Sequence, residues 1–247
     1  MTDIGKALTE RLTKTERDQS FPDSIPRDAA TLILIDRTGP EPQVLLGRRH
    51  AGHKFMPGKF VFPGGRIETG DIQMAAAREL DAAAAAKLAL HPRDAEVPAP
   101  RAFPLAAIRE TFEETGLMLG TKSGAAPAAP NSEWQAFAKA GILPDLSQIH
   151  FIARAITPPR RPKRFDTRFF TADADTIAHR VDGVITPDSE LVELVWIPIK
   201  QARELEIPPI TGIILEELNA RVKAGMDHSL PVPFYFMVEQ EFRRELL

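Results

Sequence analysis

Four charged residues in the segment AIRETFEETGL (Ala107–Leu117) have types and spacing that suit metal-dependent chemistry. On a helix, Glu110, Glu113 and Glu114 occupy positions i, i+3 and i+4, so their three carboxylates share one face. Like charges at this spacing repel each other by roughly a few tenths of a kcal/mol per pair. The plainer interpretation of an acidic run is a solvated helix face. A bound divalent cation would instead explain why three carboxylates are gathered there.

Two neighbouring features favour the cation. Ile108 and Phe112, four residues apart, lie away from the acidic face and can anchor this helix to a core, while Gly116 supplies its C-terminal stop. Upstream, FVFPGGRIETGD (Phe60–Asp71) begins as a short β-prone run that Pro-Gly-Gly interrupts, which is typical of a tight loop after a strand. The acidic helix and this loop therefore belong to one pattern.

Together the loop and the helix resemble the Nudix box, the signature of hydrolases that cleave nucleoside diphosphates linked to another moiety. In that pattern a Gly is followed after five residues by a Glu. Seven residues later come Arg-Glu, an apolar residue, any residue, Glu-Glu, any residue, Gly and an apolar residue. Here Gly65 takes the first position and Asp71 the first Glu position. The second half matches residue for residue at Arg109, Glu110, Glu113, Glu114, Gly116 and Leu117.

The sequence departs from the pattern in three places. Asp71 replaces the first Glu, Thr111 stands where an aliphatic residue is usual, and 37 residues separate Asp71 from Arg109. In the family the first acidic residue chiefly pairs with the box Arg, so we expect an ion pair between Asp71 and Arg109. A long insertion between the halves of the box resembles the branch that includes the peroxisomal coenzyme A diphosphatases.

The resemblance implies a catalytic site with Mg²⁺ or Mn²⁺ as cofactor, since oxygen ligands favour these hard ions over zinc or copper. It implies Glu110, Glu113 and Glu114 as metal ligands, with the carbonyl of Gly64 as a further ligand. Arg109 is expected to orient the catalytic carboxylates. The general base stays open, because family members take it from the box or from a later loop. The candidates are Glu110 and, in the segment TPDSE, Asp188 and Glu190.

A second resemblance concerns the substrate. The segment LLGRRHAGHKFMPGKFVFPGG (Leu45–Gly65) partly matches the coenzyme A motif that precedes the box in coenzyme A-cleaving members, with Arg49, Lys54 and Gly58 at matching places. Farther on, TPPRRPKRFDTRFF resembles a segment of the peroxisomal branch, and its Arg161 and Arg164 could meet an extra phosphate. The alternative for this second group is a set of solvated charges that guard an edge strand.

These resemblances imply a metal-dependent diphosphatase that acts on coenzyme A or acyl-coenzyme A. The products would be 4′-phosphopantetheine, free or acylated, and adenosine 3′,5′-bisphosphate. The alternative within the enzyme class is a hydrolase of ADP-ribose or NADH, and the alternative of another class is a non-catalytic Nudix-fold nucleotide sensor. The complete set of Glu110, Glu113 and Glu114 counts against the sensor, because a binding protein has no need of catalytic carboxylates.

The composition excludes several other classes. The 247 residues contain 43% hydrophobic residues, carry a net charge of −3 and include no cysteine. The charge is too close to neutral for a nucleic-acid binder, and the lack of cysteine excludes disulfides and thiolate catalysis. The charged N-terminal segment lacks the apolar region of a signal peptide, and no run is long enough for a membrane span. We therefore expect a cytoplasmic protein with a small nucleotide substrate, and a homodimer is frequent in the family.

The pattern of elements predicts an α/β fold. Strands are expected at 29–36, 43–49, 150–157, 165–171 and 191–199, with a β-prone tail, and helices at 72–90, 132–140, 199–205 and 210–224. The resemblance supplies the arrangement, a Nudix-type α/β/α sandwich with a mixed central sheet. Residues 29–247 would form one domain with a helical insertion at about 72–106, after a lead-in at 1–28 that we expect to be mobile.

Overall fold

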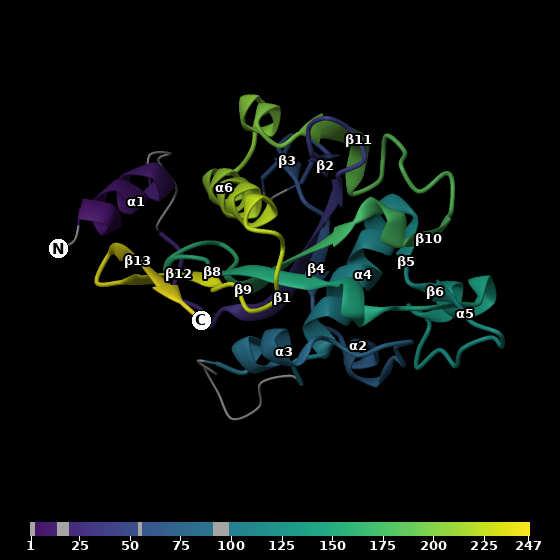
Figure 1. Cartoon of the computed structure of the whole chain (residues 1–247). Coiled ribbons are helices and arrows are strands. Elements are labelled where there is room, and N and C mark those ends of the chain that lie inside the picture. The colour runs from purple at the N-terminus through teal and green to yellow at the C-terminus, as the bar shows by residue number, and fades with distance from the viewer. Residues whose placement is uncertain (1–2, 14–19, 54–55, 91–98) are drawn as a thin grey trace.

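The computed structural model describes residues 3–13, 20–53, 56–90 and 99–247. It has three layers, with a mixed β-sheet between two layers of helices (Figure 1). The helices are α1 (Asp3–Thr13), α2 (Thr69–Gln73), α3 (Ala82–Leu88), α4 (Ala102–Thr115), α5 (Gln135–Ala140) and α6 (Pro209–Lys223). The strands are β1 (Arg27–Asp36), β2 (Gln43–Arg49), β3 (Phe60–Val61), β4 (Gly64–Arg66), β5 (Leu117–Leu119), β6 (Thr121–Lys122), β7 (Ile142–Leu143), β8 (His150–Ile156), β9 (Phe165–Asp173), β10 (Ile177–Arg180), β11 (Leu191–Pro198), β12 (Pro233–Val238) and β13 (Glu241–Leu246).

The main sheet has the strand order β11-β2-β1-β9-β8-β12-β13, and the short strands β3 and β4 pair with β2 and β1. Strand β1 runs parallel to β9 and antiparallel to β2 and β4, so the sheet is mixed. The β-prone tail forms the antiparallel hairpin β12–β13, which adds to β8 and closes that edge of the sheet. The predicted α/β/α sandwich with a mixed central sheet is confirmed.

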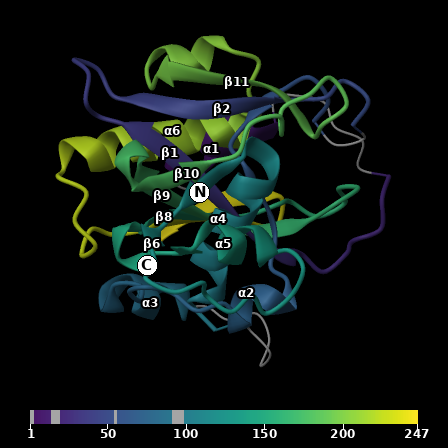
Figure 2. The same cartoon turned by 90° about the vertical axis from the view of Figure 1, so that its right-hand side faces the viewer.

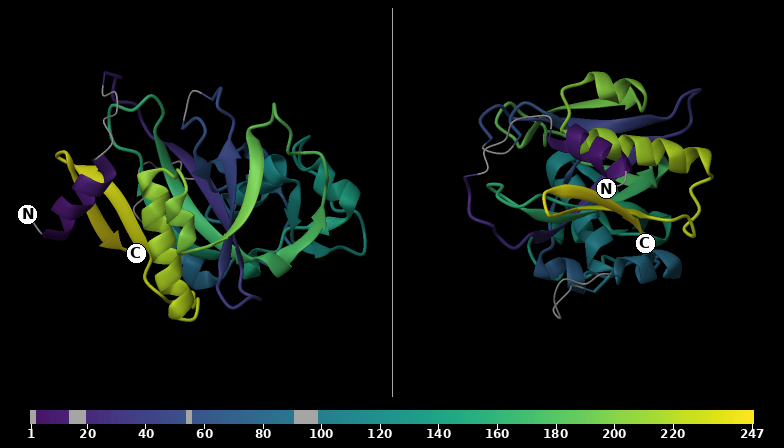
Figure 3. Two further views of the ribbon diagram at one scale, coloured as in Figure 1. Left: turned by 90° about the horizontal axis from the view of Figure 1, so that it is seen from above. Right: turned by 90° about the vertical axis from the view of Figure 1, so that its left-hand side faces the viewer.

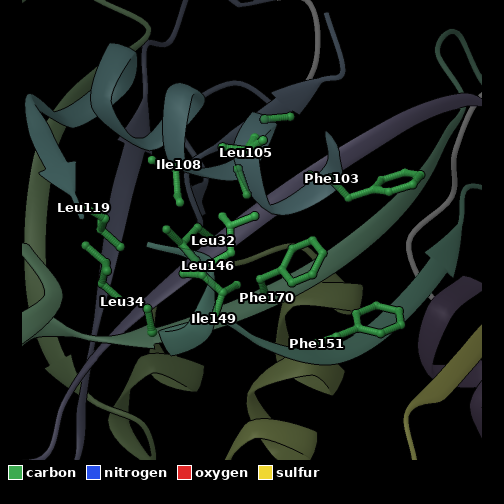
Figure 4. Close-up of a cluster of buried hydrophobic side chains, with 14 of the residues drawn as sticks. Leu32, Leu34, Phe103, Leu105, Ile108, Leu119, Leu146, Ile149, Phe151 and Phe170 are labelled. Atoms are coloured by element: carbon green, nitrogen blue, oxygen red, sulfur yellow. The ribbon is translucent and has the colours of Figure 1, made fainter. Parts of the chain in front are cut away.

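Strand β1 has apolar side chains on both faces because helices cover both sides of the sheet. Leu32 and Leu34 point toward α4, in a cluster that also contains Ile108 (Figure 4). The alternate residues Ile33 and Ile35 point to the opposite layer. This alternation explains why the segment reads as one continuous apolar run in the sequence.

Helix α4 lies across the first of these faces and carries the acidic residues of the box. Leu105 and Ile108 are buried in the core, and the helix ends at Gly116, whose φ of 77° lies in the left-handed region. A side chain at Gly116 would also meet the backbone oxygen of Val181, which a Cβ atom would approach to 2.2 Å. Glycine is therefore required at the expected helix stop.

The insertion differs from the single helix that the sequence predicts over 72–90. Over residues 69–90 the chain forms two short helices, α2 and α3, separated by an extended segment (Figure 1). Asp81 caps α3 by accepting hydrogen bonds from the backbone N–H groups of Ala83 and Ala84. Arg78 in the extended segment is paired with the buried Asp145, and this contact draws the chain away from a helical path. Helix propensity was therefore outweighed by a cap and a tertiary ion pair.

The opposite face of the sheet is covered by α6 and α1, which lie on the far side from α2, α3 and α4 (Figure 2). Helix α1 also contacts β13 and α6 (Figure 3). Within α1, Leu8 and Leu12 are buried, and Arg11 forms an ion pair with Glu216 of α6 at 2.8 Å. The described part of the lead-in thus shares the core of the main domain.

The remaining expected elements appear with small shifts of their ends. The helix expected at 199–205 is a short 3-10 helix over Gln201–Glu204, and the helix expected at 132–140 begins at Gln135. Within the residues that the structure describes, every helix is too short or too polar to cross a membrane.

Candidate active site

The acidic face of α4 meets the loop that leads out of β3. The carboxyl group of Glu110 lies directly over Gly65, where a Cβ atom would come within 2.3 Å of the Glu110 Cδ atom. Glycine at this position therefore lets α4 approach the loop. Burial raises the pKa of Glu110 to about 7, although the charge of Arg109 opposes the shift.

The expected ion pair between Asp71 and Arg109 is present and buried. Arg109 donates from Nε to Asp71 Oδ1 at 2.8 Å and from Nη2 to Asp71 Oδ2 at 3.0 Å, so the pair is bidentate. Its other donors reach the Arg66 carbonyl oxygen at 2.8 Å, Glu110 Oε1 at 2.9 Å and Glu113 Oε2 at 3.0 Å. One guanidinium therefore joins α2, the last residue of β4 and two of the box carboxylates.

Glu114 is buried and lies among other carboxylates. Its Oε2 atom accepts a hydrogen bond of 3.2 Å from the backbone N–H of Gly64. Burial raises the pKa of Glu114 well above its ordinary value, and the nearby charges of Glu190 and Glu110 raise it further. The structure thus brings Glu190, from the segment before β11, to the side of the box helix.

Glu190 is held in place by Arg49, whose Nη1 atom lies 2.8 Å from Glu190 Oε1. Arg49 is the last residue of β2, and its side chain is only 15% exposed. The antiparallel pairing of β2 with β11 sets this arrangement, because Arg49 lies opposite Leu191, the neighbour of Glu190. Sheet pairing thus joins two candidates that are far apart in the sequence.

Glu113 occupies a different side of the cluster. Its carboxylate accepts from Arg109 and is 37% exposed, the most exposed of the three box carboxylates. Burial raises its pKa, and the charge of Glu133 contributes to the same shift. The three carboxylates are therefore not equivalent: Glu110 and Glu114 face the loop of Gly64 and Gly65, whereas Glu113 faces Arg109 and Glu133.

The backbone of Gly64 faces the carboxylates as well. The residue before it, Pro63, accepts from the N–H of Leu32 in β1, and Gly65 is paired with β1 in the same antiparallel ladder. Because residues alternate in such a ladder, the N–H and C=O of Gly64 point away from β1. The hydrogen bond from Gly64 to Glu114 agrees with this direction. The carbonyl group is therefore available on the side of the site.

The oxygen atoms of the box carboxylates and of Gly64 are ligands that suit a hard divalent cation, although the side chains are not already arranged as a metal site in the described residues. Across the described ranges, no three His, Cys, Asp or Glu side chains are gathered closely enough to form a metal site by themselves. Glu114, however, is a buried carboxylate with like charges beside it, and Glu110 is a second buried carboxylate. A cation would offset this excess of negative charge, and the oxygen ligands match Mg²⁺ or Mn²⁺. The residues present therefore fit the cofactor that the sequence indicates.

The four basic candidates for substrate contact lie in different surroundings. Arg49 lines a cavity of about 450 Å³ together with Arg48, His50 and residues of the loop before β11. Arg164 is engaged elsewhere, since it donates to the carbonyl oxygen of Thr157 at 3.0 Å and pairs with Asp23. Arg161 is buried in the wall of a separate cavity. Lys54 lies outside the described residues.

Sequence reasoning missed several features of the site. The carbonyl oxygen of Arg66 completes the hydrogen bonding of Arg109, and the segment Ile185–Pro187 lines the cavity beside Arg49. The position of a backbone carbonyl cannot be read from residue types. The segment before β11 comes close to Arg49 only because β11 pairs with β2, and the order of strands in the sheet is not visible in the sequence. The one usable signal was the acidic pair in TPDSE just before a predicted strand.

The chain is similar to known proteins in sequence and in fold. No model of a known protein family matches the chain. The chain is 29% identical over 187 residues to "Putative nudix hydrolase 7" of Caenorhabditis elegans, which covers 71% of this chain and 52% of that protein. It is 26% identical over 230 residues to acyl-coenzyme A diphosphatase NUDT19 of Gallus gallus, which covers 69% of this chain and 60% of that protein. This chain therefore spans only about half to three fifths of the length of these relatives.

A solved structure shows the same fold. The chain is 29% identical to a NUDIX hydrolase from Alicyclobacillus acidocaldarius, with a TM-score of 0.59. The match covers 80% of this chain and 92% of that chain.

Proposed function

We propose that this chain, which belongs to the Nudix hydrolase family, is a metal-dependent diphosphatase whose substrate is coenzyme A, free or acylated. The reaction is hydrolysis of the diphosphate that links the two halves of the substrate. The products are adenosine 3′,5′-bisphosphate and 4′-phosphopantetheine or its acylated form.

The observation that carries the proposal is the buried Glu114 beside Glu110 and Glu190. Three carboxylates in this position leave excess negative charge, which is costly unless a cation is bound. Glu110, Glu114 and the carbonyl of Gly64 are the proposed metal ligands, and Glu113 is the proposed ligand nearest the solvent. Mg²⁺ or Mn²⁺ held there would neutralise the phosphoryl oxygens and lower the pKa of a bound water.

The remaining residues of the site have separate roles. Arg109 holds α4 to α2 through Asp71 and fixes the carboxylates of Glu110 and Glu113. Glu190 is partly exposed and is oriented by Arg49, so it can take a proton from an incoming water. Glu110, with its raised pKa, is the second candidate for this role. Glu190, from the segment before β11, and Glu110, from the box helix, are therefore both candidates for the general base.

Two observations support coenzyme A as the substrate. Arg49 and Arg48 line a cavity next to Glu190, and each is paired with one carboxylate, Glu190 or Glu193. Their remaining N–H donors can contact phosphate oxygens. The similarity to the acyl-coenzyme A diphosphatase NUDT19 of Gallus gallus points the same way. An extra 3′-phosphate distinguishes coenzyme A from ADP-ribose and dephospho-coenzyme A. If the nucleotide end binds beside Arg48 and Arg49, these basic groups favour the substrate with the 3′-phosphate.

A panel of substrates tests the proposal. We expect higher kcat/KM for coenzyme A than for dephospho-coenzyme A, ADP-ribose or NADH, with activity only in the presence of Mg²⁺ or Mn²⁺. Each charge-assisted contact to the 3′-phosphate contributes about 1.5–3 kcal/mol, which corresponds to roughly 10- to 150-fold in kcat/KM. Better cleavage of ADP-ribose or NADH than of coenzyme A would overturn the choice of substrate.

A further inference from the structure

A second cavity, of about 530 Å³, lies on the face of the sheet that α1 and α6 cover. Its volume is in the range of small-molecule sites and far exceeds the voids of a packed core. It is bounded by the ends of β8 and β9, the start of α6 and the loop before β3. Most of its lining is apolar: Leu12, Met56, Pro57, Ala155, Ile156, Pro158, Pro162, Phe169, Ile207, Pro208, Pro209, Ile210 and Phe242.

The two cavities differ in chemistry and flank the same loop. Gly58 lines the smaller cavity with Arg48 and Arg49, whereas its neighbours Pro57 and Lys59 line the larger, apolar one. This loop runs directly into β3 and the Gly64 turn of the acidic site. A substrate with a phosphorylated end and an apolar end could therefore place one end on each side of the loop, with its diphosphate at the carboxylates.

The strands link the wall of the apolar cavity to the acidic site, although the cavity lies on the α1 and α6 face of the sheet and α4 lies on the other face. Phe169, in its wall, pairs with Thr31 of β1, and Thr31 pairs in turn with Gly64 of β4. Adjacent strands lie about 4.8 Å apart, so two steps across the sheet correspond to roughly 10 Å. The backbone N–H of Gly64 donates to Glu114. A pantetheine arm that joins the diphosphate to the cavity would therefore pass around the loop at residues 57–59, which both cavities share.

We propose that the apolar cavity binds the acyl chain of an acyl-coenzyme A, so that the protein selects acylated substrates over free coenzyme A. This inference rests on the proposed function and narrows its substrate class. Arg161 is buried in the wall of the cavity, among the apolar residues. Its guanidinium suits a carbonyl oxygen of the pantetheine arm or of the thioester. The apolar walls of the cavity suit the hydrocarbon chain of the acyl group.

The expected signature is a dependence of kcat/KM on chain length. Each methylene group that leaves water contributes about 0.8 kcal/mol, equivalent to up to fourfold in kcat/KM. We expect kcat/KM to rise from coenzyme A through butanoyl- and hexanoyl- to octanoyl-coenzyme A, because every substrate in this series has the same nucleotide and diphosphate. A difference among the acylated members therefore reports on the hydrocarbon alone, and the step from coenzyme A to butanoyl-coenzyme A adds the thioester.

Two variants test where the chain binds. Ile207→Trp places a larger side chain just before α6 and Ile210→Trp places one in its first turn, both in the wall of the cavity. Each should reduce the preference for octanoyl-coenzyme A over coenzyme A by at least tenfold. Ile25→Trp makes the same exchange at a residue that is 79% exposed and lies outside the cavity wall, and it should keep the wild-type preference. Circular dichroism and the melting temperature establish which variants are folded.

The possible outcomes separate this inference from the proposed function. The inference is supported if kcat/KM rises with chain length in the wild type and rises less in either folded cavity variant. Equal kcat/KM for coenzyme A and octanoyl-coenzyme A in the wild type would overturn it and leave the proposed function standing. A preference that persists unchanged in both folded cavity variants would place the chain elsewhere. Cleavage of ADP-ribose but of no coenzyme A derivative would instead overturn the proposed function.

Discussion

The carboxylate of Glu114 occupies a position where its charge is costly to the folded protein without a cation. It is buried, and Glu190 and Glu110 both oppose its ionisation. Arg109 illustrates the opposite case, since its buried charge is matched by Asp71, Glu110 and Glu113. Glu110 belongs to both groups, because it accepts from Arg109 and also lies beside Glu114. We propose that Asp71 supports the structure through Arg109, whereas Glu110, Glu113 and Glu114 hold the metal.

Replacing Glu114 by Gln separates the two roles. The change keeps the shape of the side chain and removes its charge, so kcat should fall by on the order of 100-fold or more through the loss of a metal ligand. The melting temperature without metal should stay the same or rise, because an uncompensated buried charge is gone. We expect added Mg²⁺ to raise the melting temperature of the wild type but not that of this variant. Near-normal turnover in this variant would rule out Glu114 as a ligand.

Asp71→Asn should act mainly on stability. It leaves the buried guanidinium of Arg109 without its bidentate partner, which costs on the order of 3 kcal/mol of the free energy of unfolding. Urea denaturation measures this loss. Glu41→Gln is the matched control, because the ion pair of Glu41 with Lys200 is exposed and should contribute under about 1 kcal/mol. A large fall in kcat at unchanged stability would contradict the structural role of Asp71.

At the scale of single elements, the sequence predicted the strands and the box helix more accurately than the insertion. Continuous apolar runs such as 29–36 can only be satisfied between two layers, so periodicity identified β1 well. The prediction of one helix over 72–90 was wrong, because the Ala-rich composition indicates a high helix propensity but does not show which side chains this segment contacts in the fold. The pairing of Arg78 with Asp145 joins residues far apart in the chain, which no local pattern reveals.

The contact of β8 with the loop after α6 contains a pH-sensitive element. His150 of β8 stacks on His228 at a ring distance of 4.2 Å. Burial lowers the pKa of His150 to about 4, and the charges of His228 and Arg221 add to the shift. In the unfolded chain a histidine titrates near its ordinary pKa of about 6.5, so the unfolded state binds more protons between these two values. This residue therefore removes stability as the pH falls from about 6.5 to about 4.

His150→Phe tests this pH dependence. The free energy of unfolding should decline less steeply between pH 7 and pH 4.5 in the variant than in the wild type, since the buried ring no longer titrates. His179→Phe is the control, because His179 is exposed on β10 and should leave the wild-type slope unchanged. Denaturant titrations at several pH values provide the comparison. Identical slopes for all three proteins would show that His150 titrates normally.

At the scale of the whole molecule, the sandwich brings residues from four regions to one place. Arg49, Gly64, the box carboxylates and Glu190 meet because β2 pairs with both β3 and β11, and β4 pairs with β1. The box residues and Arg49 could be selected from the sequence, because their types and spacing resemble a known motif. The two cavities could not be selected, because an enclosed volume is a property of packed layers and not of any one segment.

We propose that this chain hydrolyses the diphosphate of coenzyme A at a metal-dependent site. The most direct measurement is mass spectrometry of the products formed from coenzyme A, with Mg²⁺ and with a chelator in its place. The account predicts 4′-phosphopantetheine and adenosine 3′,5′-bisphosphate in equal amounts, and only in the presence of the metal. Intact coenzyme A under both conditions, or release of inorganic phosphate to give dephospho-coenzyme A, would contradict it.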